Sequence, residues 1–159
     1  MEKTVVIGLG NILFGDEGFG VSVVRHMKET GGLPPEVALV DGGTGGLALR
    51  PWLEGVSLVI LVDTIALEDQ PGTLHRFLVE DLRGAGFPRA LSPHQIGILE
   101  VLDLLKFIGT APERVVVIGA VPEDVGTGIG LSPRLSTCVP RAAAMVEAEC
   151  ANGIGNGGA

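Results

Sequence analysis

Two carboxylates and one imidazole stand where an apolar run of the sequence gives way to a loop or a helix. They are Glu17, Asp63 and His94. In an open α/β sheet, ligands bind in the crevice beyond the carboxyl ends of the strands, so residues that follow strands can meet there. Carboxylate and imidazole ligands together suit a soft-to-borderline divalent metal. The sequence therefore predicts a site of this kind built from these three residues.

Glu17 belongs to a glycine-rich stretch, residues 8–20, which reads GLGNILFGDEGFG. Acids at the start of a helix complement its macrodipole, and that alone would explain Asp16 and Glu17. It does not explain the glycines, which permit tight turns and close backbone approach. A dinucleotide is disfavoured because Leu13 replaces the third glycine of the G-x-G-x-x-G pattern, and because the acids would repel a pyrophosphate. The glycine-rich stretch is therefore better suited to binding a cation.

Asp63 ends an apolar run, residues 59–62. A carboxylate at such a strand end must be paired, hydrogen-bonded or metal-bound to offset its desolvation. A simple turn or cap with Thr64 is the alternative. Asp41 holds a similar position, but it begins a glycine-rich turn and could merely bond the backbone there.

His94 lies in the first turn of the best-marked helix, where Ser92 at the N-cap and Gln95 at N3 form a capping-box pattern. The positive end of the helix dipole disfavours imidazolium, and metal coordination needs the neutral ring. A single histidine is nevertheless more often structural than a ligand. His26, within a helix, and His75, on an edge strand, are weaker candidates.

The order of elements predicts a single three-layer α/β/α sandwich with a mostly parallel central sheet. Several apolar runs lack alternation, as strands covered on both faces do. Strands are expected at 4–8, 36–41, 56–63, 72–79 and 114–121, and helices at 18–30, 47–53, 92–109 and 133–149. The strand at 56–63 should be central and that at 72–79 an edge. One domain should cover residues 1–150, with a disordered glycine-rich tail at 151–159.

Composition excludes several classes of function. The 159 residues carry 11 basic and 19 acidic side chains, a net charge of −8, so nucleic-acid and membrane-surface binding are disfavoured. No apolar run reaches the ~18 residues of a membrane span, and no signal peptide is recognisable, which favours the cytoplasm. Cys138 and Cys150 form no C-x-x-C motif and are expected to be structural. Serine-nucleophile and H-E-x-x-H motifs are absent.

The stretch 8–20, the turn 41–44, the strand-end Asp63 and the helix start 92–95 resemble, in order and spacing, the motifs of nickel–iron hydrogenase maturation endopeptidases. The resemblance covers residues 3–149. It implies a protease that removes a short C-terminal extension from the hydrogenase large-subunit precursor after nickel insertion, cleaving behind the His or Arg of a C-x-x-C-x-x-[HR] motif. It also implies that Glu17, Asp63 and His94 contact the metal.

We expect nickel to arrive with the precursor and to be captured by these three residues, so that nickel insertion licenses cleavage. The ion could also polarise the scissile carbonyl or activate water. Alternatively, Asp16, Asp41 or Asp63 could act as general base on water. Partner specificity is expected in the loops 42–50 and 122–131, and the protein is expected to be a monomer.

Two other classes of function remain open at this stage. A non-catalytic nickel-binding maturation chaperone would use the same three residues to inspect the precursor. A small-molecule hydrolase or phosphorylase would need basic phosphate-binding residues, which the acidic loop at residues 16–17 makes a poor fit.

Overall fold

The computed structural model of the chain describes residues 3–84 and 93–155, and these residues form a five-stranded sheet in the order β2–β1–β3–β5–β4. The strands are β1 (Thr4–Leu9), β2 (Ala38–Gly43), β3 (Leu58–Thr64), β4 (Leu74–Leu78) and β5 (Arg114–Ala120). Only the β4–β5 pair is antiparallel within this sheet. The α/β class, the central position of β3 and the edge position of β4 are confirmed.

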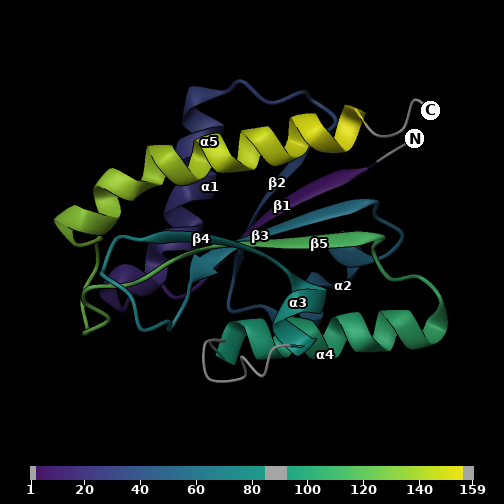
Figure 1. The fold of residues 1–159 in the computed structure, drawn as a ribbon, viewed down its shortest axis with the longest axis horizontal. Coiled ribbons are helices and arrows are strands. Elements are labelled where there is room, and N and C mark those ends of the chain that lie inside the picture. The colour runs from purple at the N-terminus through teal and green to yellow at the C-terminus, as the bar shows by residue number, and fades with distance from the viewer. Residues whose placement is uncertain (1–2, 85–92, 156–159) are drawn as a thin grey trace.

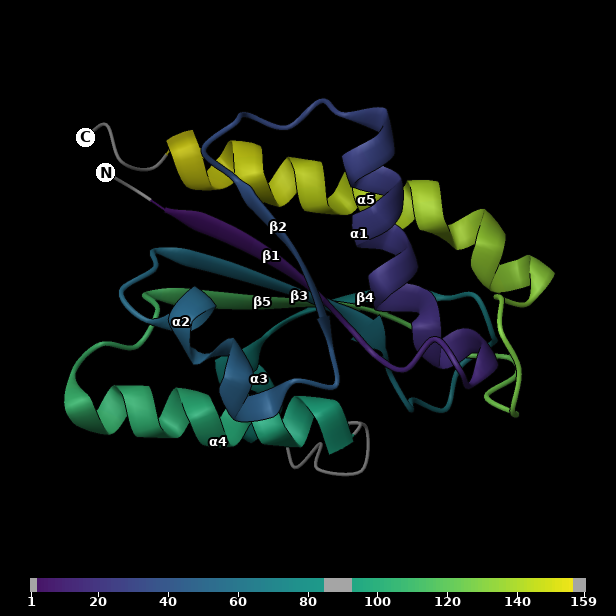
Figure 2. The same cartoon turned by 180° about the vertical axis from the view of Figure 1, so that it is seen from behind.

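Helices cover both faces of the sheet, as Figures 1 and 2 show. One layer holds α1 (Phe19–Thr30) and α5 (Pro133–Gly155), and the other holds α2 (Arg50–Leu53), α3 (Val79–Gly84) and α4 (Pro93–Ile108). Two 3-10 turns, η1 (Gly15–Gly18) and η2 (Gly46–Leu49), lead into α1 and α2.

Alternate residues of β3 enter two separate hydrophobic cores. Ile60 and Val62 pack into the core beneath α1 and α5, whereas Val59 and Leu61 pack into the core above α4. Both sets are buried, which explains why the sequence of the strand shows no polar alternation. Asp63 continues the odd-numbered set, so the pleat turns its side chain toward the α4 layer.

The sequence predicts which faces of the helices are buried better than it predicts where the helices begin and end. In α4, Ile98, Leu102 and Leu105 are buried as expected, and Gly109 closes the helix by donating its N–H to the carbonyl of Lys106 at 3.3 Å. The predicted cap at Ser92 lies outside the described residues. Helix α3 was not expected from the sequence.

The prediction of a disordered tail is wrong for its first part. Helix α5 continues through Gly155, so residues 151–155 are helical, while residues 156–159 lie outside the described part of the chain. Cys150, directly before these residues in α5, is buried. Packing of α5 against the sheet therefore outweighs the low helix propensity of the late glycines. None of the described helices could cross a membrane.

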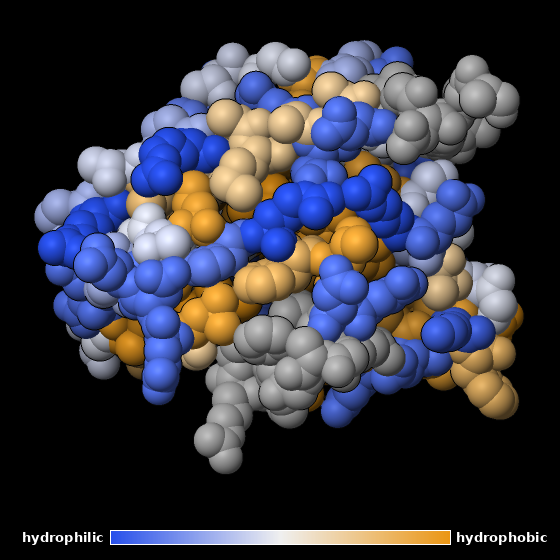
Figure 3. Space-filling model, in the orientation of Figure 1, coloured by the Kyte–Doolittle hydropathy of each residue, from blue (hydrophilic) through white to orange (hydrophobic). Residues whose placement is uncertain are grey.

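The outer edge of the sheet, at β4, carries charged side chains. Figure 3 shows a hydrophilic band on this side of the molecule, between α5 and α4. Here Glu149 of α5, buried, pairs with Arg76 of β4 and lies 3.8 Å from Arg114 of β5. The pairing raises the pKa of Arg76. Charge on an edge strand also discourages pairing with another chain.

Candidate active site

Gly10, immediately after β1, lies where two of the candidate segments meet. Its φ of +125° is a conformation that side-chain-bearing residues rarely adopt. A Cβ here would lie 1.8 Å from the carbonyl oxygen of Glu17 and 3.5 Å from Oδ1 of Asp63. Only glycine lets the Glu17 turn approach the end of β3 this closely. The N–H of Gly10 donates to Gly43 at 2.9 Å, which brings the end of β2 to the same place.

Glu17 lies in η1 with its side chain partly exposed. Its N–H donates to the carbonyl of Phe14 at 3.1 Å, which fixes the turn. Within the described residues, no donor to its carboxylate is found. Glu17 is thus an accessible acid on a rigid turn, directly before α1, where the helix dipole stabilises negative charge.

Asp63 is almost fully buried, at 1% exposure, at the carboxyl end of the central strand. Its Oδ1 accepts a hydrogen bond of 2.7 Å from the N–H of Thr64, as the turn alternative predicted. Its Oδ2 accepts a second one, of 3.2 Å, from Nε2 of Gln95 in α4. The same Nε2 donates to the carbonyl of Thr64 at 3.0 Å. Asp63 is therefore held in one orientation from two sides.

His94 lies in the first turn of α4, next to the glutamine that holds Asp63. The ring is partly buried, and its Nδ1 is buried without a hydrogen-bond partner among the described residues. A buried ring nitrogen of this kind is open to a ligand that the chain itself does not supply. The contact between Gln95 and Asp63 brings the start of α4 to the end of β3.

Asp16, weighed as a general base, has a structural task instead. Its side chain is fully buried and accepts four hydrogen bonds of 2.7–2.9 Å from the segment before α5. The donors are the N–H groups of Glu123, Asp124 and Ser132 and the hydroxyl of Ser132. With both oxygens engaged and no exposure to water, the carboxylate holds two loops together and is poorly placed to take a proton.

Asp41, the other possible general base, lies within β2, two residues before its end, beside Gly8 of β1. It is exposed and forms an ion pair of 3.4 Å with Arg25 of α1. Both residues line a shallow pocket of about 200 Å³ together with Gly10 and Asn11. Asp41 therefore lies in a pocket beside Gly10 and is engaged by Arg25.

Glu17, Asp63 and His94 come from neighbouring segments, as the positions of the strand ends predicted. Nevertheless, no three His, Cys, Asp or Glu side chains in the described part of the chain are grouped closely enough to hold a metal by themselves. The donor types fit a borderline divalent ion, and the buried Nδ1 of His94 fits a ligand from outside the chain. Such an ion would need further ligands from a partner.

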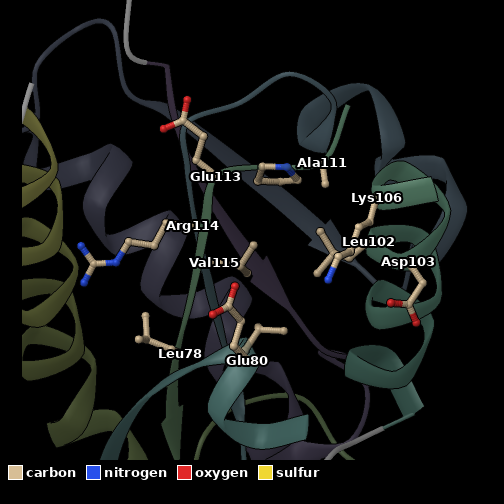
Figure 4. A pocket seen from close by; sticks show the side chains of 11 residues that line it. Leu78, Glu80, Leu102, Asp103, Lys106, Ala111, Glu113, Arg114 and Val115 are labelled. Atoms are coloured by element: carbon tan, nitrogen blue, oxygen red, sulfur yellow. The ribbon is translucent and has the colours of Figure 1, made fainter. Parts of the chain in front are cut away.

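The opposite end of the sheet contains a separate pocket of about 280 Å³ between α3, α4 and β5. Figure 4 shows Lys106 and Asp103 on its α4 side and Glu80 on its α3 side. Arg114 points away from it toward α5, where Glu149 lies. This pocket faces the amino end of β5 and thus contains none of the predicted site residues.

Comparison with known proteins identifies the family. The family model described as hydrogenase maturation protease matches residues 21–149. The chain belongs to the hydrogenase maturation protease family. It is 34% identical to the hydrogenase 2 maturation protease of Escherichia coli over 145 residues, which cover 91% of this chain and 88% of that protein. The hydrogenase maturating endopeptidase HybD from E. coli has the same fold, with a TM-score of 0.87, 32% identity and coverage of 94% and 93%.

The chain is shorter than another relative that it matches. The hydrogenase expression/formation protein HupD of Rhodobacter capsulatus is 40% identical over 128 residues, which are 79% of this chain. The match spans only 61% of that relative's length. The family resemblance inferred from residues 3–149 is confirmed, and with it the expected sandwich fold.

Two residues near the site have roles that the sequence patterns do not predict. The capping pattern explains Gln95 only as part of a helix cap, although its amide holds Asp63. Asp16 is a possible general base by sequence, but in the structure it anchors the loop at residues 123–132. A sequence signal existed for Asp16, namely an acid beside Glu17, but its partners lie more than a hundred residues away along the chain.

Proposed function

We propose that this protein is an endopeptidase that removes the C-terminal extension of a nickel-loaded [NiFe]-hydrogenase large-subunit precursor. Family membership supports this activity. The observation that carries it is the position of Asp63, buried at the end of β3, held by Gln95 of α4 and adjoining the Glu17 turn through Gly10. An accessible acid, an oriented acid and a histidine thus border one end of the sheet.

Nickel enters this proposal as part of the substrate. The precursor's own cysteines would leave part of the coordination sphere open, and Glu17, Asp63 and His94 would supply the remainder. Because no three such side chains among the described residues lie close enough to hold an ion unaided, binding would depend on the precursor's own ligands to nickel, and a precursor without nickel would be held weakly. Bound nickel would then act as the recognition element for cleavage and would add positive charge beside the scissile carbonyl.

The chain's own residues would have separate tasks in the reaction. Glu17 would bind the cargo ion from its accessible turn, and the imidazole of His94 would contact it from the α4 side. Gln95 would keep the Asp63 carboxylate in orientation. Where a carboxylate is needed to take a proton from the attacking water, Asp63 is the candidate that adjoins the Glu17 turn through Gly10. The carboxylate of Asp16 is turned instead toward the loop at residues 123–132, and Asp41 pairs with Arg25.

The compartment that fits this proposal is the cytoplasm. Cys138 and Cys150 are both buried free thiols, as expected where disulfides are kept reduced. Nickel-dependent recognition in this compartment would let folding of the large subunit follow metal insertion directly.

Intact-mass spectrometry of the precursor tests the proposal. A nickel-loaded and a nickel-free large-subunit precursor are each incubated with the protein, with a sample without protein as control. We expect loss of one C-terminal peptide from the nickel-loaded form only. Cleavage of both forms would retain the protease and reject nickel recognition. Tight binding of the cognate nickel-loaded precursor without any mass change would favour a chaperone and reject the protease.

A further inference from the structure

Four large apolar side chains are exposed on two loops beside the Glu17 turn. Leu13, Phe14, Val125 and Ile129 are 53%, 40%, 48% and 81% exposed. We refer to these four residues as the apolar platform. Such a group of exposed apolar side chains on a small domain commonly marks a binding surface.

Backbone hydrogen bonds hold the two loops of the platform side by side. The N–H of Gly128 donates to the carbonyl of Leu13, and the N–H of Gly15 donates to the carbonyl of Gly128, both at 2.8 Å. Phe14 and Gly128 form a parallel bridge. In Figures 1 and 2 the purple segment after β1 lies beside the light-green segment before α5. The platform is therefore one surface although its halves are distant in sequence.

The platform is also rigid before any partner binds. Asp16 fixes its second loop through the N–H groups of Glu123, Asp124 and Ser132. Gly15, at a φ of +54°, brings the first loop so close that a Cβ would lie 2.7 Å from the carbonyl of Asp124. A surface already ordered in the free protein loses less conformational entropy on binding.

Charge around the platform indicates the chemistry of its occupant. Residues 4–24 and 115–133 contain no lysine or arginine, whereas Glu17 and Asp124 are acidic. Glu123 is exposed as well, with Arg134 of α5 3.7 Å away. A second copy of this chain, with a net charge of −8, would be repelled on approach. A segment with apolar and basic side chains would be attracted.

We propose that the apolar platform is the docking surface for an extended segment of the precursor that combines apolar and basic side chains next to the cleaved bond. Continuity with Glu17 supports this occupant, since the platform residue Phe14 accepts the N–H of Glu17 at 3.1 Å. The inference rests on the proposed function. It adds residues that select the substrate by contact with its peptide chain, independently of the nickel ion.

The substitution Ile129→Asp tests the platform, with Phe107→Asp as its matched control. Ile129 is 81% exposed and Phe107, on the far end of α4, is 89% exposed, so neither change should disturb folding. We expect Ile129→Asp to raise both the KM for nickel-loaded precursor and the Kd of the complex about tenfold or more, with kcat within about twofold of wild type. Phe107→Asp should leave all three constants unchanged, and Ile129→Leu should retain wild-type values.

Each other outcome has a definite meaning. If Ile129→Asp has the same KM and the same Kd as the wild type, the proposed docking surface is wrong, whereas the proposed protease activity is unaffected. If the wild type binds the precursor but cleaves nothing, the proposed activity fails, and the Kd comparison still decides the platform. If sedimentation shows a wild-type dimer that Ile129→Asp dissociates without changing Kd for precursor, the platform is a self-association surface and the proposal is wrong.

Discussion

Acidic side chains are buried in two regions of this molecule, but their partners differ in kind. At the carboxyl end of the sheet, Asp16 accepts its hydrogen bonds from neutral groups, namely three N–H groups and one hydroxyl. On α5, Glu149 pairs with the guanidinium groups of Arg76 and Arg114. Neutral donors stabilise a carboxylate without cancelling its charge, whereas arginines cancel it.

The difference assigns the two regions different tasks. Around Asp16 and Glu17 the protein retains net negative charge, which attracts a cation or a basic segment. Around Glu149 two arginines offset the charge of the carboxylate, and the cluster fastens α5 to β4 and β5. A buried acid by itself therefore says little about function, and the charge of its partners says more.

The largest expected effect is on activity, and it should be seen for a substitution at Glu17 but not for one at Glu149. Glu17→Gln removes the accessible negative charge. If Glu17 contacts nickel as proposed, this change should lower processing of nickel-loaded precursor by at least roughly 100-fold, because loss of that contact would cost several kcal/mol in the transition state. Glu149→Gln should process at the wild-type rate at temperatures well below its midpoint of unfolding. Precursor mass over time measures both. Normal processing by Glu17→Gln would remove this residue from the mechanism.

The next effect is on stability. Asp16→Ala leaves several buried donors without an acceptor and should lower the free energy of unfolding by about 3 kcal/mol. Urea denaturation followed by circular dichroism measures this change. The exposed neighbour Glu123 serves as control, since Glu123→Ala removes only a surface ion pair worth about 0–1 kcal/mol. A loss for Asp16→Ala as small as that of the control would show that the loop does not depend on this carboxylate.

A smaller effect on stability is expected around Glu149. Glu149→Gln should lower the free energy of unfolding by about 1.5 kcal/mol, the contribution of a hydrogen bond to a charged group. The loss is smaller than for Asp16→Ala because Arg76 and Arg114, about 40% exposed, can be hydrated when the glutamate is neutralised. The same urea experiment applies. If Glu149→Gln lowered the free energy of unfolding more than Asp16→Ala does, hydration of the two arginines would not explain the smaller loss expected here.

The smallest effect concerns Cys150, which lies next to Glu149. Burial, with the charges of Glu149 and Glu147, raises the pKa of this thiol to about 11 from its ordinary value near 9. The unfolded chain therefore loses the thiol proton at lower pH than the folded one, and stability falls as pH rises from 9 to 11. The expected loss at pH 10 is at most about 1.4 kcal/mol.

Comparison of wild type with Cys150→Ala isolates this contribution. Between pH 8 and pH 10 the wild type should lose up to about 1.4 kcal/mol more unfolding free energy than Cys150→Ala, because only the wild type has this thiol. A difference that stays constant over this range would mean that the thiol is hydrated in the folded protein.

Sequence patterns sufficed where the deciding forces act between near neighbours. The runs that became β1, β3 and β5 are apolar on both faces, and only a covered parallel sheet buries both sets. The stripe of α4 and its terminating Gly109 are equally local. Local propensity also explains two failures. The glycines near the C-terminus concealed the last turn of α5, and α3 shows no clear periodic pattern over its six residues.

The meeting of the candidate segments could be predicted for the same reason. Strand ends and helix starts can be read from the chain, and parallel strands bring such ends together, so the segments that carry Glu17, Asp63 and His94 adjoin one another. The roles of these three residues remain predictions. The amide of Gln95 could not be assigned to Asp63, since 32 residues separate them and a capping role explained the glutamine equally well. Nothing local distinguished the buried Asp16 from the accessible Glu17 beside it.

The sequence by itself determined the sheet, the family and the types of side chain available at its carboxyl end. Only the tertiary structure decided which acid stays accessible and which one anchors a loop, because that choice depends on donors from residues 123–132 folding back over η1. It also decided that Leu13 and Phe14 would share a surface with Val125 and Ile129. Burial and hydrogen-bond partners depend on which distant segments pack together, and local sequence patterns do not specify them.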